Sequence, residues 1–199
     1  MNEDRKAKLA SNRGNVAPVA LAHIVRRTAR FDELVKWYEV VLGAKVVHSD
    51  GTLAFLTYDQ EHHRIAIAQI PGIPDQPAMA AGTDHVAFTH ADLGDLLYTY
   101  TRLKKVGVEP YWCINHGPTT SMYYKDPDGN RVEFQVDNFE SAAEASAWMR
   151  RDEFAANPIG VVFDPDDLVA RYERGEPLEQ LIRRPSLPEG TTPFEMLRF

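Results

Sequence analysis

Cysteine is almost absent from this sequence, since Cys113 is the single one among 199 residues. One cysteine excludes an internal disulfide and a metal cluster held by several thiolates, and it fits a reducing compartment. Basic residues are also in deficit, because 22 lysines and arginines stand against 29 acidic residues and give a net charge of −7. A nucleic-acid-binding protein normally presents a basic face, so this charge argues against that class of protein.

Long apolar segments are missing as well. No run of apolar residues reaches the length of about 18 that a membrane-spanning helix needs. The N-terminal residues are polar and lack the apolar core of a secretory signal. We therefore expect a cytoplasmic protein without a membrane or nucleic-acid partner. The hydrophobic content of 44% suffices for one core of ordinary size.

Hydrophobic periodicity divides the middle of the chain into two series of elements. The first comprises a strand at 19–27, a helix at 31–43 and three strands between 44 and 70. After a proline-containing loop at 71–83, the second comprises a strand at 84–90, a helix at 92–107 and short strands that end at 136. Both series therefore have the order βαβββ.

The two series also match residue by residue. When His23 is aligned with His85, five apolar positions of the two predicted helices coincide without a gap. In the last strands, Arg64 aligns with Arg131. Such a repeat predicts structurally equivalent modules. We expect an α+β fold in which two βαβββ modules form one domain, residues 18–138, with helices on one side of curved sheets and a cleft on the other.

Two segments lie outside the repeat. Residues 1–17 are predicted to be a polar arm. Residues 139–199 are predicted to be a helical extension, with a helix within 141–154 and a short helix that begins at Asp164-Pro165. Its apolar residues need burial, either on their own domain, over the cleft mouth or on a second subunit. We favour a homodimer or higher homo-oligomer.

A carboxylate interrupts the last strand of the repeat. The turn Asp126-Pro127-Asp128-Gly129 joins two β-prone runs into a hairpin, and Glu133 lies in the second run between apolar neighbours. Strand alternation directs Glu133 away from the helices and toward the cleft. The equivalent residue of the first module is Ala66. The fold therefore does not require a carboxylate at this position.

His23 and His85 begin the first strands of the two modules, so the repeat predicts that both approach the cleft. With Glu133 they form two imidazoles and one carboxylate, the ligand set of many non-haem Fe(II) sites with open coordination positions. Mn(II) or zinc can occupy the same set. The sequence therefore predicts a metal site at His23, His85 and Glu133.

At residues 18–138, and above all in "YKDPDGNRVEF", the sequence resembles the vicinal-oxygen-chelate superfamily of glyoxalases, bleomycin-resistance proteins and type I extradiol dioxygenases. The resemblance implies that Glu133 is the last metal ligand. A four-ligand glyoxalase would need a donor where Ala66 stands. The resemblance is therefore strongest to the extradiol enzymes, which cleave a catechol-type ring with Fe(II) and O2.

The same resemblance implies roles for further residues. His63, in "HHRIAIA", is implied as the acid–base residue, although strict alternation would place His62 on the cleft side instead. Tyr123 is implied as a hydrogen-bond donor to the substrate, and His116 as a residue that orients substrate or assists proton transfer. Three further side chains are candidates to line an aromatic-binding pocket: Trp112, Met122 and Phe55. Two other functions stay open, a metal-dependent glyoxalase-like isomerase or lyase and a protein that binds an aromatic ligand.

Overall fold

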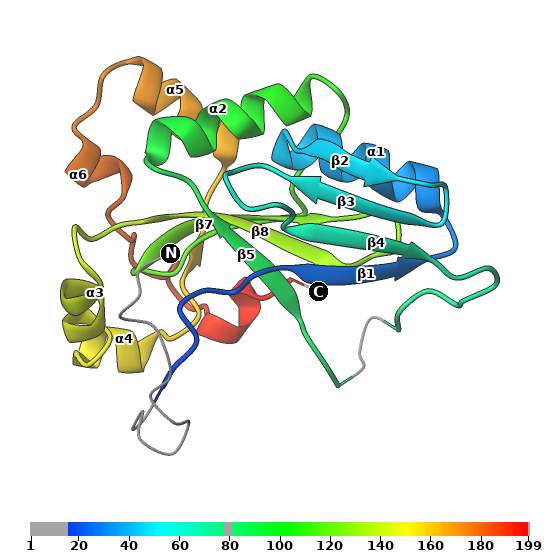
Figure 1. The fold of residues 1–199 in the computed structure, drawn as a ribbon. Coiled ribbons are helices and arrows are strands. Elements are labelled where there is room, and N and C mark those ends of the chain that lie inside the picture. Colours follow the sequence, from blue (N-terminus) through cyan, green and yellow to red (C-terminus); the bar gives the residue numbers. More distant parts are fainter. Residues whose placement is uncertain (1–15, 78–80, 199) are drawn as a thin grey trace, which may run out of the picture.

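The computed structural model describes residues 16–77 and 81–198, so most of the predicted polar arm lies outside it. The first module consists of β1 (Ile24–Thr28), α1 (Phe31–Leu42), β2 (Lys45–Ser49), β3 (Leu53–Thr57) and β4 (Ile65–Gln69). The second consists of β5 (His85–Thr89), α2 (Leu93–Lys104), β6 (Trp112–Asn115), β7 (Thr119–Lys125) and β8 (Arg131–Asp137). The predicted pair of βαβββ modules is present, with α1 and α2 on the same side of the sheets (Figure 1).

The sheets have the same internal order. The first sheet runs β1-β4-β3-β2 and the second begins β5-β8-β7-β6. In each, the first strand is parallel to the last, with Val25 opposite Ala66 and Ala87 opposite Glu133. The observed register therefore confirms that Ala66 and Glu133 occupy equivalent positions.

The ends of both helices follow from local sequence. α1 ends at Gly43, whose φ of 61° lies in the left-handed region that glycine adopts without a steric penalty. α2 begins after Asp92, whose side chain accepts a hydrogen bond from the backbone N–H of Asp95. The apolar stripes of both helices pack on the sheets in one shared core that includes Leu34, Tyr38, Leu96, Leu103 and Phe134.

β1 starts later than the predicted strand. Residues 19–23 form no sheet pairing, and the carbonyls of Leu21 and Ala22 accept hydrogen bonds from the guanidinium of Arg64, at 2.7 and 3.1 Å. Arg64 thereby holds the chain just before His23.

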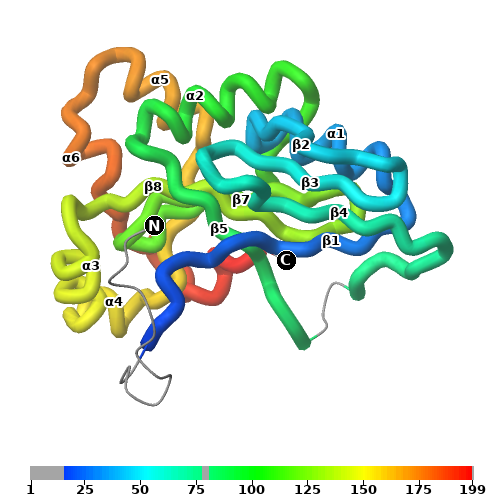
Figure 2. The backbone as a smooth tube through the Cα atoms, in the orientation of Figure 1, coloured from blue at the N-terminus to red at the C-terminus, as the bar shows by residue number. Residues whose placement is uncertain are grey.

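The extension packs on the second module of its own chain (Figure 2). A short strand, β9 (Val161–Val162), adds to the edge of β6, and Leu168 and Leu181 join the main core. The remaining elements are α3 (Ala142–Trp148), α4 (Asp152–Ala156), α5 (Pro165–Glu173), α6 (Leu178–Leu181) and the 3₁₀ turn Pro193–Met196.

The predicted helix 141–154 was wrong in extent, since the structure breaks it between Trp148 and Asp152. The break turns the Trp148 ring against Gly117, where a side chain would collide with it. The predicted start at Asp164-Pro165 is confirmed, with the Asp164 side chain as the cap of α5. None of the described helices has the length and apolarity to cross a membrane.

Candidate metal centre and active site

Successive side chains of β8 point alternately into the core and toward the predicted metal site. Val132, Phe134 and Val136 lie in the core under the helices, whereas Glu133 points to the other face. Glu133 is nevertheless 4% exposed, because Tyr123 lies directly opposite it and side chains of the second sheet surround it.

His85 contacts Glu133 on this face of the second sheet. Its Nε2 lies 3.0 Å from Glu133 Oε2. The hydrogen bond to Glu133 raises the pKa of His85 to about 9, against the effect of burial. Burial opposes the charge of Glu133, but hydrogen bonds, first of all that from His85, outweigh it and lower the pKa of the carboxyl. Glu133 is therefore an ionised carboxylate in a buried position.

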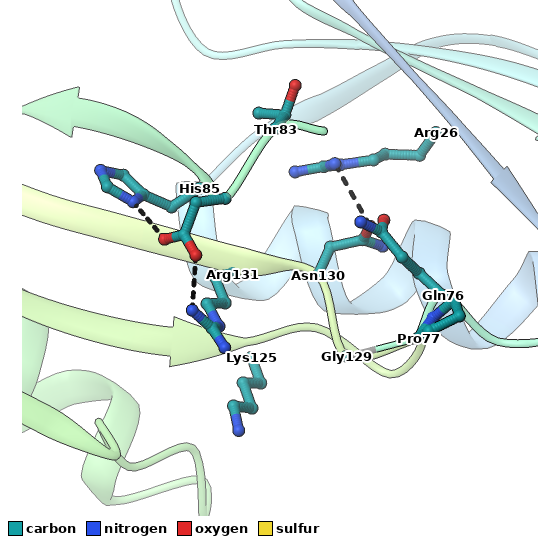
Figure 3. Close-up of a pocket in the computed structure, with 10 residues that line it drawn as sticks. Arg26, Gln76, Pro77, Thr83, His85, Lys125, Gly129, Asn130 and Arg131 are labelled. Atoms are coloured by element: carbon teal, nitrogen blue, oxygen red, sulfur yellow. Dashed lines mark hydrogen bonds and ion pairs between the residues drawn. The ribbon is translucent and has the colours of Figure 1, made fainter. Parts of the chain in front are cut away.

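Asp84 fixes the orientation of His85. Its carboxylate lies 2.8 Å from His85 Nδ1 and 2.6 Å from Arg131, the contacts drawn as dashed lines in Figure 3. A carboxylate on one ring nitrogen leaves the other nitrogen to face a metal, the usual arrangement for a histidine ligand. Our sequence analysis missed Asp84. The acidic residue directly before His85 was a signal that could have identified it.

A line of polar contacts runs from the neighbourhood of Glu133 into the extension. Tyr123 lies opposite Glu133 in the ladder, and its hydroxyl lies 3.0 Å from Nε2 of His116. His116 Nδ1 in turn contacts the carbonyl oxygen of Ile159. Burial, with the nearby Glu133 charge, raises the pKa of Tyr123, and burial lowers the pKa of His116. Both groups are therefore neutral, and the phenol keeps its proton.

Aromatic rings enclose the Tyr123 side of the site. Trp112 lies opposite Tyr123 across β6 and β7 and stacks on it, with ring centroids 4.6 Å apart. The indole Nε1 of Trp112 is buried without a hydrogen-bond partner in the described structure. Apolar residues of the extension, including Ile159 and Met196, pack against the same group.

Met122 does not line this site, so that prediction is corrected. It is fully buried in the helix-side core, opposite Phe134. Neighbours in a strand face opposite sides, and the position of Tyr123 on the site face excludes Met122 from it.

The first module contributes a second group of rings. His63 lies 4.4 Å from His23 and 4.7 Å from Phe55, measured between ring centroids. His63 precedes β4 and so escapes the alternation that would turn it toward the helices. His62 is the more exposed of the two, and its Nδ1 lies 2.6 Å from Nδ1 of His63.

The structure thus brings two of the three predicted ligands into contact. His85 and Glu133 meet, whereas His23 contacts His63, and among residues 16–77 and 81–198 no three acidic, histidine or cysteine side chains converge on one point. His23 does line a cavity together with Val86 and Ala87 of β5, so β1 and β5 lie side by side there.

An imidazole and a carboxylate are donor types that a divalent metal such as Fe(II) or Mn(II) accepts. Two ligands at about 2.1 Å from an ion and at a right angle to each other are about 3.0 Å apart. The His85–Glu133 distance is 3.0 Å, which suits two adjacent coordination positions.

Comparison with known proteins agrees with this chemistry. A family model described as "Glyoxalase/Bleomycin resistance protein/Dioxygenase superfamily" matches residues 20–134. "Biphenyl-2,3-diol 1,2-dioxygenase 2" of Rhodococcus globerulus is 46% identical over 162 residues, which are 80% of this chain and 85% of that protein. "Biphenyl-2,3-diol 1,2-dioxygenase 3" of the same organism is 42% identical over 166 residues, 82% of this chain and 87% of that protein.

Solved structures share the fold at low identity. A glyoxylase/bleomycin resistance protein/dioxygenase domain from Frankia sp. EAN1pec superposes with a TM-score of 0.52 at 18% identity, over 61% of this chain and all of that domain (100%). At this identity the similarity shows the fold alone.

Proposed function

The chain belongs to the Glyoxalase/Bleomycin resistance protein/Dioxygenase superfamily, and we propose that it is an extradiol dioxygenase, which opens the ring of a catechol-type substrate with O2. One observation carries the proposal: Glu133 and His85 meet at 3.0 Å on the sheet face that also holds Tyr123 and His116. A buried carboxylate bonded to a histidine has no role in packing, because Ala66 fills the equivalent position of the first module.

The substrate that we propose is a catechol with an aryl substituent, such as biphenyl-2,3-diol. Both curated relatives are named for cleavage of this diol between C1 and C2. Two aromatic side chains support a flat, apolar guest, namely Trp112 in the second module and Phe55 in the first. Cleavage at C1–C2 breaks the bond beside the diol on the aryl-bearing side.

We propose that Fe(II), or Mn(II) in its place, is held by His23, His85 and Glu133. His23 occupies the position of the first module that is equivalent to His85, since Ile24 pairs with Ile65 as Val86 pairs with Val132. Such a metal would bind the substrate through its two adjacent oxygens and would supply a path for electron density from the ring to O2, so no external reductant would be needed.

His63 is suited to remove a proton from the substrate. Burial, and the imidazoles of His23 and His62, lower the pKa of His63, so its ring is neutral at neutral pH. Its Nδ1 faces His62, which leaves Nε2 to accept the proton of the second substrate hydroxyl and to return it later.

Tyr123 and His116 are suited to the opposite side of the substrate. The raised pKa of Tyr123 keeps its phenol protonated, so it donates a hydrogen bond to a deprotonated substrate oxygen. His116 Nε2, at 3.0 Å from that phenol oxygen, is placed to orient the hydroxyl of Tyr123.

The test is anaerobic reconstitution with Fe(II), followed by O2 and either biphenyl-2,3-diol or unsubstituted catechol. We expect stoichiometric oxygen uptake and a new visible absorbance, with the aryl diol preferred. Iron binding without oxygen uptake on either diol would instead favour a metal-dependent isomerase or lyase. Failure to bind any metal would favour a protein that binds an aromatic ligand. The same preparation with Mn(II) distinguishes the two metals.

We also propose that the chain acts in the cytoplasm as a homo-oligomer. Exposed apolar side chains of the first module, among them Val25 and Val47, support an interface with another copy. Its single cysteine, Cys113, is buried, and burial raises the pKa of its thiol to about 12. Size-exclusion chromatography with light scattering tests the oligomeric state.

A further inference from the structure

The contact between His116 and Ile159 joins the predicted active site to the C-terminal extension. His116 Nδ1 contacts the carbonyl oxygen of Ile159, and its Nε2 lies 3.0 Å from the Tyr123 hydroxyl. A carbonyl oxygen can only accept a hydrogen bond, so Nδ1 must carry the proton. A neutral ring protonated at Nδ1 leaves the Nε2 lone pair to face Tyr123.

The turn that presents the Ile159 carbonyl is built by two residues. The Asn157 side chain accepts hydrogen bonds from the backbone N–H groups of Ile159 and Gly160, at 3.2 and 2.8 Å, and donates one to the Gly160 carbonyl at 3.0 Å. Asn157 is 6% exposed, so these bonds are protected from water. Gly160 has φ 119°, and a side chain there would collide with the carbonyl of Asn115.

Arg184 clamps this turn onto the second module. Its guanidinium donates hydrogen bonds to the carbonyls of Asn157 and Glu153, at 2.7 and 3.0 Å, and reaches that of His116 at 3.4 Å. The same guanidinium lies 4.7 Å from the centre of the Trp148 ring. The side chain of Arg184 is 6% exposed. An arginine buried on three carbonyls of two segments holds those segments in one arrangement.

We propose that the turn 157–160 of the extension is a positioning device that holds His116 in its Nδ1–H form, so that Nε2 accepts a hydrogen bond from the Tyr123 hydroxyl. Asn157 is its principal positioning residue, and Arg184 anchors it. The catalytic consequence rests on the proposed dioxygenase function, whereas the ring form of His116 does not. Without the Ile159 acceptor the Nε2–H form becomes available, and it would present Tyr123 with a donor in place of an acceptor.

The test is ¹⁵N spectroscopy of the histidine side chains in the metal-free protein, in which the two neutral ring forms have distinct nitrogen shifts. The chain has 7 histidines, and the variant His116→Gln identifies the signals of this one by their loss. The wild-type protein should show His116 protonated at Nδ1. An Nε2–H pattern in the wild type would overturn the proposal before any variant is made.

Three variants then locate the cause. Asn157→Leu removes all three side-chain bonds of the turn, and the His116 signals should shift toward the Nε2–H form or a mixture. Asn157→Asp keeps the two acceptor bonds and should preserve the wild-type pattern. Asp166→Ala, the control, loosens the extension elsewhere by removing the bonds of Asp166 to Tyr100 and Lys104, and should also preserve the pattern. An unchanged His116 in folded Asn157→Leu would contradict the proposal.

Kinetics supply the second readout. In reconstituted Asn157→Leu we expect kcat to fall by about tenfold or more, as for a hydrogen-bond donor that is no longer held in position, with KM within about twofold of wild type. One outcome is that the ¹⁵N spectra agree with all the expected ring forms of His116 while neither the wild type nor any variant consumes oxygen. In that case the dioxygenase proposal fails and the positioning of His116 stands. Oxygen uptake by a wild-type protein whose His116 is in the Nε2–H form would instead support the dioxygenase and overturn the positioning of His116.

Discussion

Tyr123 lies directly opposite Glu133 in the β7–β8 ladder, and the equivalent pair in the first module is Phe55 opposite Ala66. The same two positions of a repeated fold thus hold a phenol and a carboxylate in one module and only hydrocarbon in the other. The hydrogen-bonding chemistry of the site is concentrated in the second module. The first module supplies an apolar wall and two histidines, His23 and His63.

Glu133→Ala should abolish metal binding while the protein stays folded. The change removes one proposed metal ligand, which is also the hydrogen-bond partner of His85. We therefore expect the affinity for iron to fall at least about 100-fold, more than is typical when a residue that only supports a ligand is lost. The free energy of unfolding should fall by no more than about 1–3 kcal/mol, the cost of unpaired buried polar groups. Iron content after reconstitution and thermal unfolding measure the two effects.

The control for this experiment is Gln135→Ala. Gln135 follows Glu133 by two residues, faces the same side, and bonds to Thr89. It should bind iron as the wild type does. Stoichiometric iron in Glu133→Ala would remove Glu133 from the ligand set.

Asp84→Ala should weaken metal binding without a large change in stability. Asp84 holds His85 through Nδ1, and loss of such a partner typically costs about 10–100-fold in affinity. The side chain of Asp84 is 62% exposed, so its pairs with His85 and Arg131 contribute little to the fold. Competition with a metal chelator measures the affinity.

Asp59→Ala is the matched control for Asp84. Asp59 pairs with Arg64, the first-module equivalent of Arg131, but contacts no proposed ligand. Its removal should leave the metal affinity unchanged. Equal losses in both variants would mean that the arginine pairs, and not the contact to His85, support the metal.

Substitution of Met122 should change mainly the stability of the fold, whereas substitution of Phe55 should change mainly substrate binding. Met122→Ala opens a cavity in the core and should lower the free energy of unfolding by about 2–5 kcal/mol, with kcat/KM of the folded fraction unchanged. Phe55→Ala should raise KM for an aryl diol with a smaller loss of stability, because Phe55 is partly exposed on the site face. Denaturant unfolding and steady-state kinetics separate the two.

The conservative variant Met122→Leu keeps the core volume and should cost less than about 1.5 kcal/mol. If Met122→Leu changes the preference between aryl and unsubstituted diols, Met122 contacts the substrate after all, and our correction is wrong.

Much of the fold could be predicted from the helical and strand periodicities of the apolar residues and from the repeat of the βαβββ module. The alternation in β8 placed Glu133 and its apolar neighbours on opposite faces, and the structure agrees. The same rule, applied to the residue before Tyr123, would have excluded Met122 from the site. That error came from choosing residue types suited to an aromatic guest without consulting their strand positions.

Other features had no local pattern that could reveal them. β9 has two residues, too few for any periodicity, and it is a strand only because the edge of β6 is available. The contact of Ile159 with His116 is made by a backbone carbonyl, and every residue has one. His63 departs from alternation because it stands before β4, where the chain is not held by ladder bonds.

The final prediction separates His63 from His62. His63→Phe should retain iron but lower kcat by about 10²–10⁴-fold, because the base for the second substrate hydroxyl is lost. His62→Phe should retain both iron and most of the activity, since His62 is exposed and reaches the site only through His63. Phenylalanine preserves the ring contacts with His23 and Phe55, so the comparison reports on proton transfer and not on packing.

The pH dependence gives an independent check. A base acts only when neutral, so kcat/KM should fall as pH decreases through the pKa of His63. Burial and the adjacent imidazoles of His23 and His62 lower that pKa, which places the acid limb below the value of about 6.5 for an ordinary histidine. His63→Phe should lose this limb, while His62→Phe should move it upward, because one source of repulsion is gone. If His62→Phe loses the limb and His63→Phe keeps it, the alternation of β4 extends further toward the N-terminus than the structure indicates, and His62 is the acid–base residue.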